Sequence, residues 1–252
     1  MTKATKTTSW GPVAAWYDEH LANADTYHER LVLPNTMRMA GIKAGDRILD
    51  LACGQGFGAR KFAEHGAVVT GCDISKELIE IARSVSPSIQ YEVTPANNLS
   101  FARDASFDIV ICILALQNIK DLRGTLAESA RVLTPKGRIY CIINHPAFRI
   151  PKASSWGYSK ATNTQYRRIE QYMSESEVEI DMHPGISKRS TTVSFHRPLQ
   201  VYLKAMRNAG LALTHMEEWI SDLESTSGPR ADAENKARKE IPLFMALELK
   251  KI

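Results

Sequence analysis

What this sequence lacks sets the first limits on its function. None of its four cysteines forms a C-x-x-C pair, and its seven histidines never show the H-x-x-x-H spacing of a metal site. Its longest apolar run, Ile109 to Leu116, is far too short to span a bilayer. The segment from Met1 to Ser9 has no apolar stretch of the kind found in secretory signals. We therefore expect a reduced, cytoplasmic protein with no metal ion and no membrane partner.

The charge distribution also lacks the marks of a dedicated nucleic-acid binder. The net charge is +4 and the pI is near 8.8, without a dense stripe of Lys and Arg. There is no internal repeat and no low-complexity tract in the 252 residues. A chain of this length and composition suits one large core, so we expect a single domain over 1–252, present as a monomer or homodimer, with no nucleic-acid partner.

The most informative stretch runs from Arg47 to Gly58. A short apolar run ends in an acid and is followed by three glycines at alternate positions, Gly54, Gly56 and Gly58. This order predicts a strand, a tight turn and a helix, which is the start of a nucleotide-binding α/β unit. Glycine turns the chain sharply and lets a ligand approach bare backbone. Backbone amides at the start of the helix would then face the ligand.

Apolar runs and helical patterns alternate over most of the chain. We expect strands at 47–51, 68–72, 89–93, 107–113 and 138–143, helices between them, and a final helix 198–209 with strands 211–219 and 243–249. This alternation predicts an α/β fold with a doubly wound, mostly parallel sheet. Ligands of such sheets bind at the carboxyl ends of the strands. The residues that fall at this edge are Gly54, Asp73, Ala96, Asn97, Ile113 and Leu114.

Asp73 ends the second predicted strand, 19 residues after Gly54. Dinucleotide and nucleoside sites place a carboxylate at this interval, where it accepts hydrogen bonds from both ribose hydroxyls. The glycines alone also fit a dinucleotide fingerprint, Gly54-x-Gly56-x-x-Ala59. Three features distinguish this chain from a dinucleotide-binding dehydrogenase. Asp50 stands where a dehydrogenase strand is usually apolar, the glycines continue to Gly58, and the chain ends in a pattern that suits an antiparallel hairpin.

Two segments lie outside the alternating pattern. Residues 10–40 are rich in aromatic and aliphatic side chains with helical spacing, and form either a helical pair packed on a sheet edge or a cover over the ligand. Residues 145–196 interrupt the order after the fifth strand, with alternation that suits antiparallel strands. We expect this insertion to form a lid or substrate subdomain above the ligand edge.

Taken together, these motifs resemble those of the class I S-adenosylmethionine-dependent methyltransferases. The segments that carry the resemblance, in the expected order, are Ile48–Gly56, Gly71–Ser75, Pro95–Leu99, Phe107–Val110, Arg131–Leu133 with Pro135–Gly137, and Gly210. The resemblance implies a seven-stranded sheet with the last strand antiparallel, and S-adenosylmethionine as the cofactor, with S-adenosylhomocysteine as the product.

The resemblance also implies a role for each cofactor-binding position. Gly54 and Gly56 would pass under the methionine part, and Asp50 would help to place its ammonium group. Asp73 would hold the ribose hydroxyls. The remaining expected contacts are Ile74 on the adenine face, Ala96 and Asn97 at the adenine edge, Ile113 and Leu114 near the sulfonium, and Tyr17 and Ala52. The sequence departs from the family at Pro95, where many relatives have an acid that accepts from the adenine amino group.

Catalysis by such an enzyme requires alignment of nucleophile, methyl and sulfur, so a dedicated base is optional. His145 is the first candidate base, because it follows the fifth strand and imidazole titrates near neutral pH. Alternatively, His145 caps the turn that leaves this strand. His196 is the second candidate, or only a residue that fastens the insertion. The expected substrate contacts are Trp16, Arg149, Trp156 and Tyr166.

The sequence thus predicts methyl transfer to an oxygen or nitrogen nucleophile of a small molecule. The aromatic and cationic side chains of 145–196 suit a small, flat or anionic acceptor. Methylation of RNA or protein is the second hypothesis. The sequence disfavours it, because no separate recognition domain or basic stripe is visible. A protein that binds S-adenosylmethionine without turnover is the third.

Overall fold

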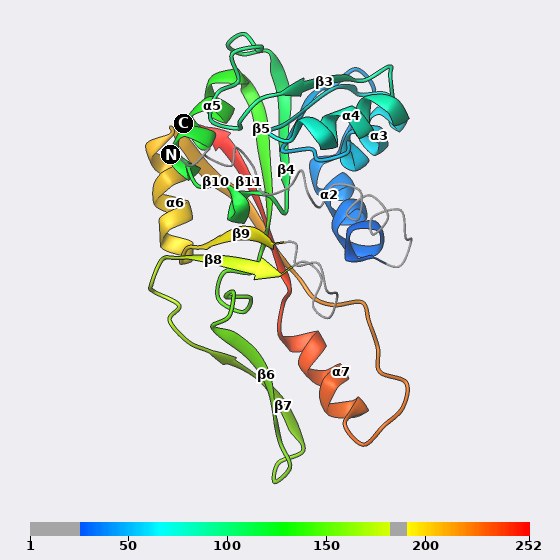
Figure 1. The fold of residues 1–252 in the computed structure, drawn as a ribbon, viewed down its shortest axis with the longest axis vertical. Coiled ribbons are helices and arrows are strands. Elements are labelled where there is room, and N and C mark those ends of the chain that lie inside the picture. The colour runs from blue at the N-terminus through cyan, green and yellow to red at the C-terminus, as the bar shows by residue number, and fades with distance from the viewer. Residues whose placement is uncertain (1–25, 182–190) are drawn as a thin grey trace, which may run out of the picture.

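A seven-stranded mixed sheet forms the centre of the molecule (Figure 1). The computed structural model describes residues 26–181 and 191–252. The strands follow the order β3-β2-β1-β4-β5-β11-β10, in which the first five are parallel and β11 is antiparallel to both neighbours. This confirms the expected fold class. The strands are β1 Arg47–Leu51, β2 Val68–Asp73, β3 Gln90–Val93, β4 Phe107–Ile113, β5 Leu133–Asn144, β10 Leu211–Trp219 and β11 Phe244–Lys251.

Helices cover both faces of the sheet. One face packs against a π-helical turn and three helices, η2 His28–Val32, α2 Leu33–Ala40, α3 Phe57–Glu64 and α4 Lys76–Val85. The other packs against η3 Leu116–Asn118, α5 Leu122–Val132 and α6 Leu199–Asn208. Neighbouring strand residues serve opposite faces, so Ile48 belongs to one core and Leu49 to the other. Burial on both faces explains why β4 is apolar almost throughout.

Local sequence signals set several of the helix ends. The Ser75 hydroxyl accepts from the Leu78 amide (3.3 Å) and caps α4, as expected. Gly210 adopts a φ of 73° directly after α6, which is the left-handed conformation that glycine takes at a helix end. Pro34 lies in the first turn of α2, where its missing amide costs nothing.

One predicted turn is part of a strand in the structure. The sequence Pro135-Lys136-Gly137 indicates a turn before the fifth strand, but β5 already begins at Leu133. Leu133 pairs with Phe107, and the register then shifts so that Arg138 pairs with Ile109. The residues between Leu133 and Arg138 form an irregularity in the β4–β5 ladder. The strand assignment continues across them because Leu133 and Arg138 both pair with residues of β4.

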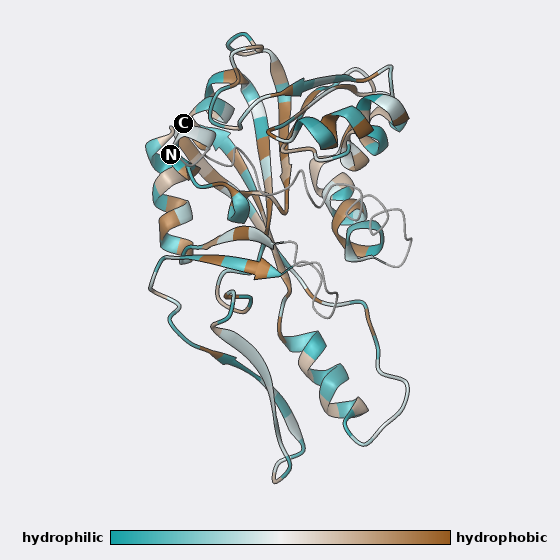
Figure 2. Cartoon of the chain, in the orientation of Figure 1, coloured by the Kyte–Doolittle hydropathy of each residue, from teal (hydrophilic) through white to brown (hydrophobic). Residues whose placement is uncertain are grey.

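The insertion after β5 forms two separate antiparallel hairpins, β6 Ser154–Ser159 with β7 Thr164–Ile169, and β8 Ser176–Asp181 with β9 Thr191–His196. The β8–β9 hairpin lies below the carboxyl ends of the central strands (Figure 1). The β6–β7 hairpin points away from the sheet beside α7 Ala231–Glu240. Figure 2 shows that α7 is mostly hydrophilic, whereas the central strands are mostly hydrophobic. In the described part of the chain, no helix has the length and apolar character needed to cross a membrane.

Candidate functional site

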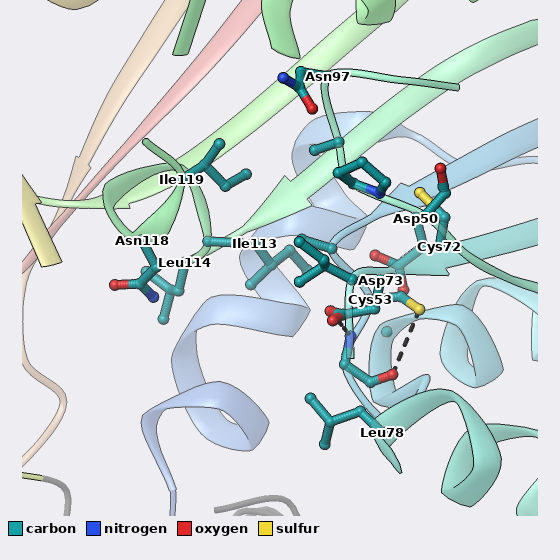
Figure 3. A pocket seen from close by; sticks show the side chains of 18 of the residues that line it. Asp50, Cys53, Cys72, Asp73, Leu78, Asn97, Ile113, Leu114, Asn118 and Ile119 are labelled. Atoms are coloured by element: carbon teal, nitrogen blue, oxygen red, sulfur yellow. Dashed lines mark hydrogen bonds between the residues drawn. The ribbon is translucent and has the colours of Figure 1, made fainter. Parts of the chain in front are cut away.

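A cavity of about 470 Å³ opens at the carboxyl ends of β1, β2 and β4 (Figure 3). Nine of the eleven residues predicted to bind the cofactor line it: Asp50, Ala52, Gly54, Asp73, Ile74, Ala96, Asn97, Ile113 and Leu114. Gly56 belongs to the same turn without lining the cavity, and Tyr17 lies outside the described residues. The edge expected from the order of strands is therefore the edge where the cavity forms.

The turn between β1 and α3 is built from left-handed backbone. Gly54 and Gly56 have φ angles of 56° and 76°, and Ala52 has 58°, which is uncommon for a residue with a Cβ. A Cβ added at Gly56 would collide with the hydroxyl of Tyr91. The turn thus requires glycine at position 56 for both its dihedral angle and the space behind it.

The Asp73 carboxylate is fixed by backbone amides. Gly54 N–H donates to its Oδ2 (3.0 Å), and Ser75 N–H donates to its Oδ1 (2.8 Å). Burial raises the pKa of Asp73, and the amides of Ser75, Gly54 and Ile74 oppose this shift. Because each carboxylate oxygen has a further lone pair, the group can still accept hydrogen bonds from a ligand.

The Asp50 carboxylate, by contrast, is not satisfied by the described residues. It is 3% exposed, and its Oδ2 has no hydrogen-bond partner among them. Burial raises the pKa of Asp50 to about 7, with the Ala59 amide opposing and the Asp73 charge adding to the shift. A Cβ added at Gly58 would lie 3.2 Å from Oδ2, so this glycine keeps the carboxylate accessible from the helix side. An unpaired buried carboxylate in a cavity wall suits a cationic ligand group.

A third acid, Asp121, lies at the edge of the cavity where Pro95 stands in place of the expected carboxylate. Asp121 caps α5 by accepting from the Gly124 amide (2.9 Å), and it also accepts from Asn97 Nδ2 (2.8 Å). Both Asn97 and Asp121 line the cavity. Sequence reasoning missed Asp121, although an Asp directly before the predicted helix at 122 is a standard N-cap signal.

The other end of the cavity is mainly apolar. Its walls come from the turn after β4 and from the β8–β9 hairpin, through Ile113, Leu114, Ile119, Val193 and Phe195. Leu114 has a φ of 50°, a strained conformation for this residue type, held by its amide bond to Ile142 O (2.7 Å). Lys120 and Glu177 form an ion pair (3.7 Å) between these two elements, and both line the cavity. His28, which the sequence suggests is a surface or packing residue, also lines it.

The structure does not bring the two predicted base candidates to this cavity. His145 is buried, and its Nε2 lies 2.7 Å from Glu218 Oε1. Its Nδ1 accepts from the amides of Ala147 (3.2 Å) and Phe148 (3.4 Å), which is the geometry of the turn cap. His196 is also buried, with its Nε2 2.8 Å from the carbonyl oxygen of Tyr172. A catalytic role for either histidine stays a prediction.

The predicted substrate contacts that the structure describes do not line this cavity either. Trp156 and Tyr166 lie exposed on the β6–β7 hairpin, which pairs only with itself and packs on α7. Arg149 lines a second, smaller cavity. Trp16 lies outside the described residues. The elements that do cover the first cavity, β8 and β9, carry no single strong motif, so only their position in the fold identifies them.

Two cysteines of the cavity wall are poor nucleophiles. Burial raises the pKa of Cys72 to about 12 and that of Cys53 well above its ordinary value. Both thiols are therefore protonated at neutral pH. In the described ranges, no three His, Cys, Asp or Glu side chains are arranged to hold a metal ion.

Comparison with known proteins agrees with this geometry. A family model described as "Methyltransferase domain" matches residues 49–141. A demethylmenaquinone methyltransferase of Tropheryma whipplei (strain Twist) is 38% identical over 112 residues, which cover 43% of this chain and 46% of that protein. The chain thus spans just under half the length of this relative. A demethylmenaquinone methyltransferase of Paenarthrobacter aurescens (strain TC1) is 27% identical over 217 residues, or 83% of this chain and 77% of that protein.

The similarity extends to solved structures. An S-adenosylmethionine-dependent methyltransferase from Mesorhizobium loti superposes with a TM-score of 0.69 at 27% identity, over 86% of this chain and 96% of that one. Residues 49–141 thus match a methyltransferase domain, and the chain shares the fold of S-adenosylmethionine-dependent methyltransferases.

Proposed function

We propose that this protein transfers a methyl group from S-adenosylmethionine to an oxygen or nitrogen nucleophile of a small molecule. The observation that carries the proposal is the pairing of a fixed carboxylate, Asp73, with an unsatisfied buried one, Asp50, in a single cavity. The cavity continues from these acids to an apolar end, which leaves space for a second molecule.

The residues present fit S-adenosylmethionine. The unpaired Oδ2 of Asp50 would accept from the ammonium group, and this contact would satisfy a charge that the described protein leaves unpaired. Asp73, held by Gly54 and Ser75, would accept from the ribose hydroxyls. When bound, the cofactor supplies a methyl group on a positively charged sulfur.

The adenine end requires an acceptor other than Pro95. Because Asn97 Nδ2 donates to Asp121, the amide is held in one orientation and its Oδ1 is left for the adenine amino group. We therefore place Asn97 in the role of the missing acid and Asp121 in the role of orienting it.

The protein's own contribution to transfer would be alignment and exclusion of water. The apolar side chains of Leu114, Ile119 and Phe195 close the end of the cavity opposite the ribose site. Approximation of two bound reactants can supply roughly 7–11 kcal/mol of a barrier, so no strong base is required. Where the acceptor must lose a proton, His28, Lys120, Asp121 and Glu177 are titratable side chains of the described wall besides Asp50 and Asp73.

A small acceptor is favoured by the walls and by the relatives. The enclosed apolar end suits a small molecule, and the two curated relatives above are named for a small-molecule acceptor, demethylmenaquinone. Methylation of RNA or protein, and cofactor binding without turnover, are the alternatives that the following experiments separate.

The first test measures cofactor affinity by titration calorimetry with S-adenosylhomocysteine. We expect Asp73→Ala to weaken binding by at least about 100-fold, because hydrogen bonds to a buried charge are worth about 1.5–3 kcal/mol each. The matched control is Asp232→Ala, which removes an exposed acid of α7 remote from the cavity. Equal affinity in Asp73→Ala and the parent protein would refute this cofactor site.

The second test identifies the acceptor class. The protein is incubated with a methyl-labelled donor and a cell extract separated into metabolite, nucleic-acid and protein fractions. We expect label in the metabolite fraction, absent with Asp73→Ala. Label in RNA or protein would replace the proposed acceptor class, and binding without any transfer would support the non-catalytic alternative.

A further inference from the structure

A second cavity, of about 220 Å³, lies beside the cofactor cavity. Phe195 of β9 lines both cavities, whereas Ser194 and His196 line the second cavity and not the first. Among the described residues that line it, three are arginines, Arg149, Arg167 and Arg197, and none is acidic. Its wall is therefore cationic and polar without an internal counter-charge.

The segment from Asn144 to Pro151 builds this cavity. His145 caps its own turn and stacks on Phe148, with ring centroids 4.6 Å apart. The carbonyl oxygen of Phe148 accepts from Arg167 Nε (2.7 Å), and Ser154 Oγ accepts from Arg167 Nη2 (2.7 Å). Arg167 also lies over the Trp156 ring, 5.2 Å from its centroid. These contacts fix one guanidinium in the cavity wall while leaving its Nη1 available.

Arg149 is held differently. Its guanidinium lies over the Phe244 ring, 5.1 Å from the centroid, and no acceptor among the described residues takes a hydrogen bond from it. Burial lowers the pKa of Arg149, and the neighbouring charge of Arg167 lowers it further. Two partly buried cations that repel each other cost free energy unless an anion joins them.

The third arginine is already used by the protein. Arg197 donates to the carbonyl oxygens of Leu116 (3.3 Å), Ile119 (2.8 Å) and Lys120 (2.9 Å). The free charges of the cavity are therefore those of Arg149 and Arg167.

We propose that this second cavity binds a small oxyanion, a carboxylate or phosphate group, between Arg149 and Arg167. Planar guanidinium groups match the geometry of these oxyanions and bind them more strongly than neutral donors do. The volume is below the roughly 300 Å³ at which pockets for whole drug-sized ligands begin, so it suits a charged group of a few atoms. Phe195 is the one described residue that lines both cavities, so the two lie side by side. The oxyanion is therefore either a free ligand or part of the methyl acceptor.

The direct test uses crystals of the parent protein soaked in selenate, an oxyanion located by its anomalous scattering. We expect a peak between Arg149 and Arg167. In solution, calorimetry with inorganic phosphate should show binding that Arg149→Gln weakens by at least about tenfold. The matched control is Arg168→Gln, because Arg168 is the exposed neighbour of Arg167 on β7 and pairs with Glu170 outside the cavity.

The outcomes are separable. Selenate sites only elsewhere, or equal phosphate affinity in Arg149→Gln and Arg168→Gln, would overturn the proposal. If Arg149→Gln fails to fold by circular dichroism, the soak of the parent protein still decides. Phosphate that competes with label transfer in the extract assay would assign the oxyanion to the acceptor, and phosphate that binds without affecting transfer would assign it to a separate ligand. If the parent protein did not bind S-adenosylhomocysteine, that result would contradict the proposed function and would leave the oxyanion proposal standing.

Discussion

At the scale of single residues, two acids of the same cavity do different work. Asp73 is held by two backbone amides, so its charge is compensated before any ligand arrives. Asp50 is buried with one oxygen unsatisfied by the described residues. Under the proposed function, Asp73 would accept from the ribose hydroxyls of S-adenosylmethionine and Asp50 from its ammonium group.

The raised pKa of Asp50 predicts a pH-dependent stability. Its pKa is about 7 in the folded protein and about 3.9 in an unfolded chain, so the folded state binds more protons between these values. The free energy of unfolding should therefore fall by roughly 2–4 kcal/mol as the pH rises from about 4 to about 7. Asp50→Asn, which cannot titrate, should lack this slope in urea unfolding measured across the range. Parallel pH profiles for the two proteins would contradict the assignment.

At the scale of elements, the β1–α3 turn depends on backbone that only glycine adopts easily. Gly56 combines a φ of 76° with contact to Tyr91, whose hydroxyl is itself hydrogen bonded to Ser86 (2.8 Å). Gly41, at the end of α2, has a φ of 56° and nothing within 4 Å of an added Cβ. The two positions share the dihedral requirement and differ in the space available.

We expect Gly56→Ala to be more harmful than Gly41→Ala. Each should lose about 1 kcal/mol of stability from its left-handed conformation. Gly56→Ala should lose a further ~1–3 kcal/mol, because Tyr91 must move, and its affinity for S-adenosylhomocysteine should fall. Thermal unfolding and calorimetry of both variants measure these effects. Equal losses of stability, with unchanged affinity, would show that the space behind Gly56 is unimportant.

The β8–β9 hairpin shows how strand alternation divides two cavities. Of the first and second cavities, Val193 lines only the first and Ser194 lines only the second, whereas Phe195 lines both. Sequence alternation predicted a strand here, yet it does not reveal which cavity each face meets.

At the scale of the whole molecule, Arg197 joins the insertion to the Rossmann-like core. It is 6% exposed and donates to three carbonyl oxygens of the segment after β4, while Ser194 Oγ donates to a fourth, that of Gln117 (3.5 Å). These bonds hold the β8–β9 hairpin over the carboxyl edge of the sheet.

Loss of this arginine should destabilise the protein and loosen the site. We expect Arg197→Ala to lower the free energy of unfolding by about 2–4 kcal/mol, because it removes a buried side chain that donates to three buried or partly buried carbonyl oxygens. Arg123→Ala, an exposed change on α5, should shift it by less than about 0.5 kcal/mol. Urea unfolding of both variants measures the difference. A small effect of Arg197→Ala would mean that water replaces its hydrogen bonds.

Much of the core and cofactor site could be predicted from the sequence. Parallel strands with helices between them must place their carboxyl ends at one edge, so Gly54, Asp73 and Asn97 could be grouped without coordinates. The sequence predicted that the whole insertion lies above the ligand edge, but it could not show that only the β8–β9 hairpin of the described insertion lines the cavity, because two hairpins joined by irregular segments have no such constraint. Asp121 also escaped prediction as a ligand-side residue, since its N-cap role does not show that it meets Asn97.

By itself, the sequence indicated the alternation of strands and helices, the glycine turn and the two acids, because periodicity, turn chemistry and chain order act through local rules. Only the tertiary structure decided the rest. It set His145 against Glu218 and brought Arg149 and Arg167 together from different segments. It also directed β6–β7 away from the cavity and β8–β9 toward it. These outcomes depend on packing between residues distant in sequence, for which no local pattern exists.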